Sequence, residues 1–164
     1  MSQQSNLIFF TGKMGAGKST KSQQIALEKG AVLLSEDEWL SALYPNEIHS
    51  FDDYIRYSLR MKPLIHGLVK NILQTGSDVV MDFPANTQRQ RKWFLDLALE
   101  ADVNHQLIYL KMSDEICLKQ ISQRRTEQPQ RAKFDTESVF YETMKYFEEP
   151  HEDELLNIEL IERK

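Results

Sequence analysis

The chain has 164 residues and a formal net charge of −5 at pH 7, and 41% of its residues are hydrophobic and 27% charged. This length suits one domain with a sizeable core, and this composition is ordinary for a soluble globular protein. The negative charge argues against extended nucleic-acid binding, although a single nucleotide or a nucleic-acid end can still bind in a local basic cleft.

The first predicted elements frame a phosphate-binding motif. An apolar run at 7–10 predicts a short buried strand, and the sequence KSTKSQQIALEK at 18–29 predicts a helix. Between them, residues 12–19 spell GKMGAGKS, which matches the P-loop pattern G-x-x-x-x-G-K-S. Backbone N–H groups in such a loop form a concave anion nest, and the helix N-terminus adds partial positive charge. The motif therefore predicts binding of a nucleoside triphosphate.

The residue types in this loop have separate expected tasks. The glycines permit backbone angles and a close approach to phosphate that a Cβ would block. Lys18 is expected to reach the β- and γ-phosphates, and Ser19 to offer its hydroxyl to Mg²⁺. No guanine signature of the Asn-Lys-x-Asp kind is present in the sequence, which favours ATP over GTP. The residues predicted to hold ATP here are Gly12, Lys13, Met14, Gly15, Ala16, Gly17, Lys18, Ser19 and Thr20.

Strands and helices are predicted to alternate along the rest of the chain. The further strands are predicted at 31–35, 78–83, 106–112 and 156–161. The further helices are predicted at 36–43, 51–74, 87–100, 113–125 and 135–149. Asn86 or Thr87 and then Ser113 are the expected N-caps. Pro63 predicts a kink or a break in the long helix, 126–134 a loop, and the acidic stretch 148–154 a solvated turn.

This alternation of helices with short, mostly apolar strands predicts an α/β fold. The expected architecture is a three-layer α/β/α arrangement with a parallel five-stranded sheet. We expect a single domain over residues 1–164, because no linker or internal repeat interrupts the pattern. Open sheets of this kind bind ligands beyond the carboxyl ends of their strands. The polar side chains at those ends are therefore the candidates for chemistry.

Acidic residues follow two of the predicted strands. Asp37 is the candidate base that accepts the proton of an acceptor hydroxyl, with Glu36 and Glu38 as local alternatives. The competing interpretation is that all three acids only stabilise a helix N-terminus. Asp82 closes the next strand, where it would serve the water shell of Mg²⁺, contact the acceptor hydroxyl or simply form a turn. We predict Ser19 and Asp82 as the metal-site residues.

Arginines flank the proline-containing loop and predict a small lid at about 125–134. Cations that fold over the phosphates neutralise the charge that spreads during transfer, and a closing lid excludes water. Arg124 is the predicted catalytic arginine, and Arg125 and Arg131 are predicted nucleotide contacts. The alternative is an ordinary surface helix end. Arg56 and Arg60 share a helix face in the candidate acceptor-binding region at 36–75, where they hold an anionic acceptor or form a solvated face.

Other residue types exclude several kinds of site. The single cysteine, Cys117, rules out an internal disulfide and a multi-cysteine zinc site, and its apolar context predicts a buried thiol. The four histidines are scattered and form no metal-ligand pattern. With no signal segment and no apolar run of membrane-spanning length, we expect a cytoplasmic protein with no membrane partner.

Five segments, taken together, resemble a known group of proteins. They are FFTGKMGAGKST, LLSEDEW, VVMDFPANTQRQR, CLKQISQRR and FEEPHEDE, in this order. The chain resembles the small P-loop kinases that include zeta toxins, polynucleotide 5′-hydroxyl kinases and chloramphenicol phosphotransferase. The resemblance implies a nucleotide-kinase-like P-loop fold and ATP- and Mg²⁺-dependent phosphorylation of a hydroxyl. It also implies that Asp37 is the catalytic aspartate, that Asp82 is the acid ending the third strand, and that Arg124 and Arg131 belong to the lid.

Two positions depart from this family pattern. Leu40 stands where polynucleotide kinases often carry an arginine for the acceptor phosphate, and Gln120 stands where a further lid arginine is common. Both departures weaken the case for a nucleic-acid acceptor. The leading hypothesis is a kinase of a small-molecule acceptor that uses Lys18, Asp37 and Arg124. The alternatives are a nucleoside monophosphate or polynucleotide kinase, and an ATP-binding switch with slow hydrolysis.

Overall fold

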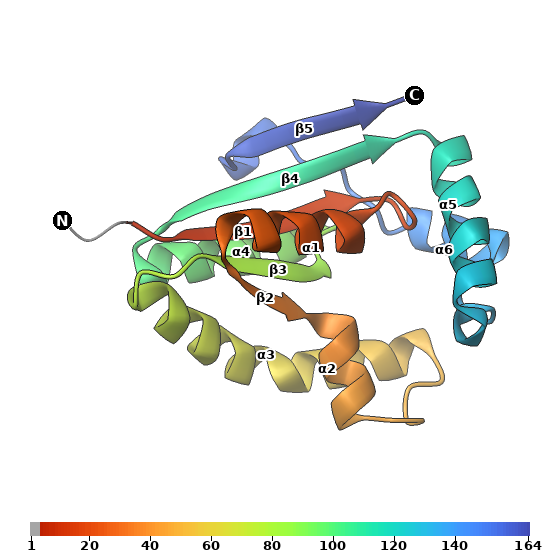
Figure 1. Ribbon diagram of the computed structural model, residues 1–164, viewed down its shortest axis with the longest axis horizontal. Coiled ribbons are helices and arrows are strands. Elements are labelled where there is room, and N and C mark those ends of the chain that lie inside the picture. The colour runs from red at the N-terminus through yellow and green to blue at the C-terminus, as the bar shows by residue number, and fades with distance from the viewer. Residues whose placement is uncertain (1–3) are drawn as a thin grey trace.

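A computed structural model describes residues 4–164 and has the predicted three-layer α/β/α architecture around one five-stranded sheet (Figure 1). All neighbouring strands pair in parallel, in the order β2-β3-β1-β4-β5. The strands are β1 (Asn6–Gly12), β2 (Val32–Ser35), β3 (Val79–Pro84), β4 (Asn104–Met112) and β5 (Ile158–Arg163). The predicted fold class is confirmed.

The helices connect the strands and cover the two faces of the sheet. They are α1 (Lys18–Lys29), α2 (Glu36–Leu43), α3 (Phe51–Gln74), α4 (Gln88–Ala101), α5 (Asp114–Glu127) and α6 (Glu137–Met144), with short 3₁₀ helices η1 (Pro129–Arg131) and η2 (Glu152–Glu154). Figure 1 shows α1 in front of the sheet and α4 behind it, with α5 and α6 beyond the carboxyl ends of the strands. Among residues 4–164, no helix is both long enough and apolar enough to cross a bilayer.

The alternation of side chains along β1 divides the core into two halves. Leu7 and Phe9 pack with apolar side chains of α3 and α4, whereas Ile8 and Phe10 pack with those of α1, α5 and α6. Successive side chains of a strand point to opposite faces of its sheet, so one short strand serves both halves. This is why the central strand is a continuous apolar run rather than an alternating one.

Several helix boundaries follow from capping residues that the sequence displays. Gly30 takes a left-handed conformation after α1 and donates its N–H to the carbonyls of the last turn. Thr87 forms a capping box with Gln90 at the start of α4, and Ser113 accepts the N–H of Ile116 at the start of α5. Thr87 and Ser113 are thus confirmed as N-caps.

Of the kink or break predicted at Pro63, the break is wrong, because α3 runs through this residue. A proline inside a helix leaves the carbonyl four residues earlier without its N–H partner. Both Pro63 and Leu59 are exposed, so water can satisfy the freed carbonyl.

The last predicted helix, at 135–149, was too long. Thr136 caps α6 and Asp135 lies outside the helix, where it binds arginines. At the other end, the N–H of Glu148 donates to the carbonyl of Asn86, 2.8 Å away, instead of continuing the helix. The predicted loop at 126–134 is also partly helical, since α5 extends into it and η1 follows.

The acidic stretch at 148–154 is more than a solvated turn. Arg91 is 1% exposed, and its guanidinium binds both carboxylate oxygens of Glu154, at 2.8 and 3.1 Å. It also donates to the carbonyl oxygens of Ala85 and Glu148. This buried cation attaches the segment before β5 to the β3–α4 turn.

Candidate active site

The P-loop lies at the carboxyl end of β1 and leads directly into α1, as predicted. It packs against α5 so closely that Gly15 has no room for a side chain: a Cβ would lie 2.6 Å from the carbonyl oxygen of Cys117 and 2.6 Å from Cγ1 of Ile121. The φ of Gly15 is also positive, at +80°. Cys117 is fully buried behind the loop, which confirms the prediction of a buried thiol.

Further contacts join this loop to its surroundings. Lys13 forms an ion pair of 2.7 Å with Asp114, the first residue of α5. Asn86, which follows β3, accepts hydrogen bonds from the Thr11 hydroxyl at 3.0 Å and from the Gly12 N–H at 3.1 Å. Sequence reasoning considered Asn86 only as a helix cap. Its contact with the P-loop spans 74 residues or more, so no local pattern indicates it.

Lys18 carries a positive charge that the loop itself partly accommodates. Its ammonium donates to the carbonyl oxygens of Gly12 and, at 3.1 Å, Lys13. Burial lowers the pKa of Lys18 to about 8, the negative charges of Asp82 and Asp37 oppose this shift, and the charge of Arg124 adds to it. An anion bound in the loop would restore the preference for the charged form.

Asp82 and Ser19 form the neighbourhood that a magnesium ion would need. Burial raises the pKa of Asp82, the charge of Asp37 adds to the shift, and a hydrogen bond with the Ser19 side chain and the charge of Lys18 oppose it. Mg²⁺ usually keeps several waters and takes one or two carboxylates beside the phosphates of its substrate. One carboxylate and one hydroxyl next to the P-loop suit this coordination. Within the described residues, no cluster of three or more His, Cys, Asp or Glu forms a metal site of another kind.

The side chains of the three acids after β2 differ in whether they are buried or exposed. Glu36 is buried, and its carboxylate accepts hydrogen bonds from the hydroxyls of Tyr54 and Ser58 on α3. Asp37 and Glu38 are exposed. Of these two, Asp37 is the one whose charge acts on both Lys18 and Asp82. Burial thus distinguishes Glu36 from the other two acids, and the effect of the Asp37 charge on Lys18 and Asp82 distinguishes Asp37 from Glu38.

Two of the three predicted lid arginines, Arg124 and Arg131, bind one carboxylate that the sequence analysis did not single out. Arg124 binds Asp135 with two hydrogen bonds, and Nε of Arg131 lies 3.1 Å from the same carboxylate. Asp135 is fully buried, while the two arginine side chains are 31% and 32% exposed. Arg125 is exposed on α5. The only sequence signal for this cluster was the spacing of four residues between Arg131 and Asp135.

Several other side chains, among them further predicted site residues, have packing contacts or lie exposed. Arg56 and Arg60 place their guanidinium groups over the Tyr57 ring, at 5.0 and 5.3 Å, and Arg56 also pairs with Asp53. Trp39 and Trp93 pack at the edge of the core. Ala16 is buried, Met14 contacts Thr143 of α6, and Thr20 is exposed on the first turn of α1.

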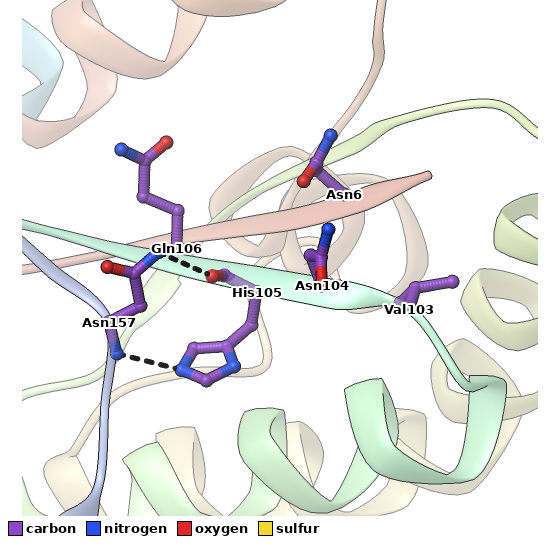
Figure 2. A pocket seen from close by; sticks show the side chains of 6 residues that line it. All are labelled: Asn6, Val103, Asn104, His105, Gln106 and Asn157. Atoms are coloured by element: carbon purple, nitrogen blue, oxygen red, sulfur yellow. Dashed lines mark hydrogen bonds between the residues drawn. The ribbon is translucent and has the colours of Figure 1, made fainter. Parts of the chain in front are cut away.

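One hollow on the described surface adjoins the P-loop, and another, polar hollow lies away from it. The adjoining hollow, of about 300 Å³, lies at the ends of β4 and β5 and includes Lys13, Lys111 and Arg163. The other, of about 560 Å³, lies at the opposite end of the sheet and is lined by Asn6, Val103, Asn104, His105, Gln106 and Asn157 (Figure 2). In it, the N–H of Asn157 donates to Nε2 of His105. Its place at the amino ends of β1 and β4 separates it from the candidate site.

Solved structures with the same fold include P-loop kinases. The chain is similar to a candidate kinase from Chloroflexus aurantiacus, with a TM-score of 0.73 and 18% identity over 98% of this chain and 89% of the other. It is similar to Kti12 of Chaetomium thermophilum, which was solved with ADP-AlF3, with a TM-score of 0.68 and 18% identity over 95% and 88%. It is also similar to the APS kinase of Mycobacterium tuberculosis, solved with AMPPNP and APS, with a TM-score of 0.56 and 20% identity over 80% and 73%.

At these identities the likeness establishes the fold. Curated protein sequences contain no significant match to the chain. The narrower resemblance to zeta toxins, polynucleotide kinases or chloramphenicol phosphotransferase stays a prediction. A family profile described as an AAA domain, AAA_33, matches residues 7–150, which is most of the chain. With its P-loop between β1 and α1 and its acids at the neighbouring strand ends, the chain belongs to this AAA domain family.

Proposed function

We propose that the protein is an ATP- and Mg²⁺-dependent phosphotransferase that moves the γ-phosphoryl group of ATP to a hydroxyl of a small-molecule acceptor. The observation that carries the proposal is the position of Asp37, two residues after Ser35, which pairs with Asp82 on the neighbouring strand. The P-loop follows the next strand, β1, at the same end of the sheet, and the charge of Asp37 acts on both Lys18 and Asp82. A nucleotide-binding loop needs no exposed carboxylate at this point to hold ATP. Transfer to an alcohol uses a base that accepts the hydroxyl proton, and a carboxylate at this position suits that role.

The proposed roles follow from the positions of the side chains. The P-loop N–H groups and Lys18 bind the β- and γ-phosphates, and Arg124 stabilises the charge that develops on the γ-phosphoryl oxygens. The acceptor oxygen forms its bond to the γ-phosphorus as the bond from that phosphorus to the β–γ bridging oxygen breaks. Asp37 takes the hydroxyl proton, and ADP leaves with the bridging oxygen. Mg²⁺, held near Ser19 and Asp82, supplies neutralisation of the phosphate charge when bound.

A small acceptor is favoured over a polynucleotide by the position of Leu40. This residue is 4% exposed and belongs to the core between α2 and the sheet. It stands where an arginine would hold the acceptor phosphate in the polynucleotide kinases that the sequence resembles. A buried leucine offers no contact to such a phosphate.

The test is ADP formation from Mg·ATP with pools of hydroxyl compounds: sugars, amino sugars, nucleosides, nucleoside monophosphates and 5′-hydroxyl oligonucleotides. A product in the active pool is expected to gain the mass of one phosphoryl group. Asp37→Asn is expected to lower acceptor-dependent turnover by about 100-fold or more while AMPPNP still binds, because general-base catalysis contributes about this much. Asp96→Asn, at a half-exposed aspartate of α4 that pairs with Lys92, is the control and is expected to keep its turnover.

Two results would contradict the proposal. Full acceptor-dependent turnover in Asp37→Asn would remove Asp37 as the base. Slow hydrolysis that no pool stimulates would favour an ATP-binding switch instead. Stimulation confined to nucleoside monophosphates or 5′-hydroxyl ends would replace the small-molecule acceptor by a nucleotide one.

A further inference from the structure

Glu36 is a buried carboxylate that the proposed chemistry does not use. It is 3% exposed, and Tyr54 and Ser58 both donate their hydroxyl hydrogens to it, Ser58 at 2.9 Å. Within residues 4–164 no basic side chain forms an ion pair with it. Burial raises the pKa of Glu36, and the charge of Asp37 adds to this shift. The hydrogen bonds from Tyr54 and Ser58 and the charge of Lys62 oppose it.

The hydrogen bonds to Glu36 fix the orientation of its carboxylate in addition to joining α2 to α3. A buried carboxylate without an ion-pair partner is expensive to desolvate, and an apolar side chain would fill the same space at lower cost. Two hydroxyl donors on successive turns of α3 instead fix both oxygens of Glu36. They tie the first residue of α2 to the first two turns of α3, which are linked in sequence only through the segment 44–50.

The neighbour of Glu36 along the chain is Asp37. Consecutive side chains of an α-helix point about 100° apart around its axis. Once Glu36 is held against α3, the direction of Asp37 is therefore set by the helix geometry. Asp37 is exposed, and its charge acts on Lys18 and Asp82.

We propose that Glu36 is a positioning residue: through its hydrogen bonds to Tyr54 and Ser58, it holds the Asp37 carboxylate in place for the acceptor hydroxyl. This inference rests on the proposed function, since it needs Asp37 to act as the base. It adds that α3, in the candidate acceptor-binding region, is joined through hydrogen bonds to the helix that carries the proposed catalytic base, Asp37. A displacement of α3 by an acceptor would move Asp37 as well.

The test removes the hydroxyl groups and leaves Asp37 unchanged. The variants are Tyr54→Phe, Ser58→Ala, their combination, and Glu36→Gln beside Glu36→Leu. Tyr57→Phe is the matched control, because Tyr57 lies on the same helix and packs its ring on Tyr44, 4.2 Å between centroids. For each variant, kcat is measured with Mg·ATP, once with water as the only acceptor and once with the acceptor found in the pool assay. The affinity for AMPPNP and the melting temperature are measured as well. Crystal structures with Mg·AMPPNP give the position of Asp37.

The double variant is expected to lose about 10- to 100-fold in kcat with little change in AMPPNP affinity, because a displacement of about 1 Å at a reacting group has this effect. Glu36→Gln keeps one oxygen acceptor for the hydroxyls and is expected to lose less than Glu36→Leu. Asp37 should be displaced in the double variant and not in Tyr57→Phe.

Unchanged kcat in the double variant and in Glu36→Gln, with turnover lost in Asp37→Asn, would overturn the positioning role and leave the proposed function intact. A lower kcat with Asp37 in its original place would also overturn it. Retained turnover in Asp37→Asn would overturn the base assignment, and with it this role. If Glu36→Leu does not fold, Tyr54→Phe and Ser58→Ala still test the positioning role, because each of them removes only one hydroxyl group.

Discussion

Arg124 binds Asp135 through two parallel hydrogen bonds, with Nε 2.9 Å from Oδ2 and Nη2 2.6 Å from Oδ1. This paired geometry fixes the plane of the guanidinium and leaves its other N–H groups available. Because Asp135 is fully buried, the arginine is held by a part of the fold that cannot move freely. The candidate catalytic cation is therefore preorganised before any nucleotide binds.

Replacement of Arg124 by lysine is expected to lower kcat by about 10- to 100-fold, because an ammonium cannot form the paired contact with Asp135 and reach the phosphates at once. The measurement is steady-state turnover with Mg·ATP. Arg89→Lys, on the exposed surface of α4, is the control and should behave as the wild type. Equal turnover in both variants would show that Arg124 does not act on the phosphates.

Removal of the Asp135 charge is expected to destabilise the protein. Asp135→Asn leaves the Arg124 and Arg131 guanidiniums without their shared carboxylate. Because both arginines are partly exposed, the free energy of unfolding should fall by less than when a fully buried pair is broken. We expect a loss of about 2 kcal/mol. Urea unfolding monitored by circular dichroism measures this loss. Glu137→Gln, two residues away and exposed, is the control and should unfold as the wild type does.

Nucleotide affinity is expected to fall as the pH rises above about 8. The pKa of Lys18 is lowered to about 8 by burial, and bound phosphates favour its charged form, so binding takes up a proton wherever the free lysine is neutral. The dissociation constant for AMPPNP should then rise by up to about tenfold per pH unit. Calorimetry in buffers of different ionisation enthalpy measures the proton uptake. An affinity independent of pH in this range would contradict the shifted pKa.

A methyl group at Gly15 should disturb the P-loop, whereas one at Gly30 should not. Gly15→Ala brings its Cβ within 2.6 Å of two atoms of α5, so the loop must shift and AMPPNP affinity should fall by about tenfold or more. Gly30 has a positive φ too, but no atom lies within 4 Å of the Cβ position. Gly30→Ala should therefore lower the free energy of unfolding by only about 1 kcal/mol, through backbone strain, and leave the affinity for AMPPNP unchanged. Comparable affinity losses in both variants would contradict this account.

The Arg91–Glu154 pair should make stability depend on pH on the acidic side. Burial tends to raise the pKa of Glu154, but hydrogen bonds from Arg91 and from the His151 N–H outweigh it and lower the pKa below its ordinary 4.5. A carboxylate whose pKa is lower in the folded protein stabilises the fold at pH values above its pKa in the unfolded chain. This stabilisation is lost as the pH falls through its pKa in the folded protein. The free energy of unfolding should thus decrease below about pH 4.5.

Glu154→Gln removes this part of the pH dependence. At neutral pH the variant should be less stable by about 3 kcal/mol, because Arg91 stays buried without its counter-charge. Glu152→Gln, an exposed neighbour in the same short helix, is the control. Unfolding curves at neutral and acidic pH for the three proteins measure the effect, and parallel pH profiles of wild type and Glu154→Gln would contradict it.

The local elements were predictable where their signal is short-range. The range of α1 was predicted at both ends, because its first residue follows the P-loop glycine and Gly30 ends it. The end of α6 was not, since Glu148 leaves the helical pattern for a backbone contact with Asn86, far away in the sequence. Likewise, the acidic stretch 148–154 has the composition of a solvated turn, and only the structure shows that the buried Arg91 binds it.

The sequence by itself determined the P-loop, the alternation of strands and helices, and hence the parallel sheet whose carboxyl ends carry the candidate chemistry. These depend on hydrophobic periodicity and on capping and glycine residues, which act over a few positions. Only the tertiary structure decided that Glu36 is buried and Asp37 exposed, that Asp135 binds Arg124 and Arg131, and that Asn86 accepts hydrogen bonds from Thr11 and Gly12 of the P-loop region. Contacts across 11, 22 and 75 residues create these arrangements, and they exist only once the core has packed.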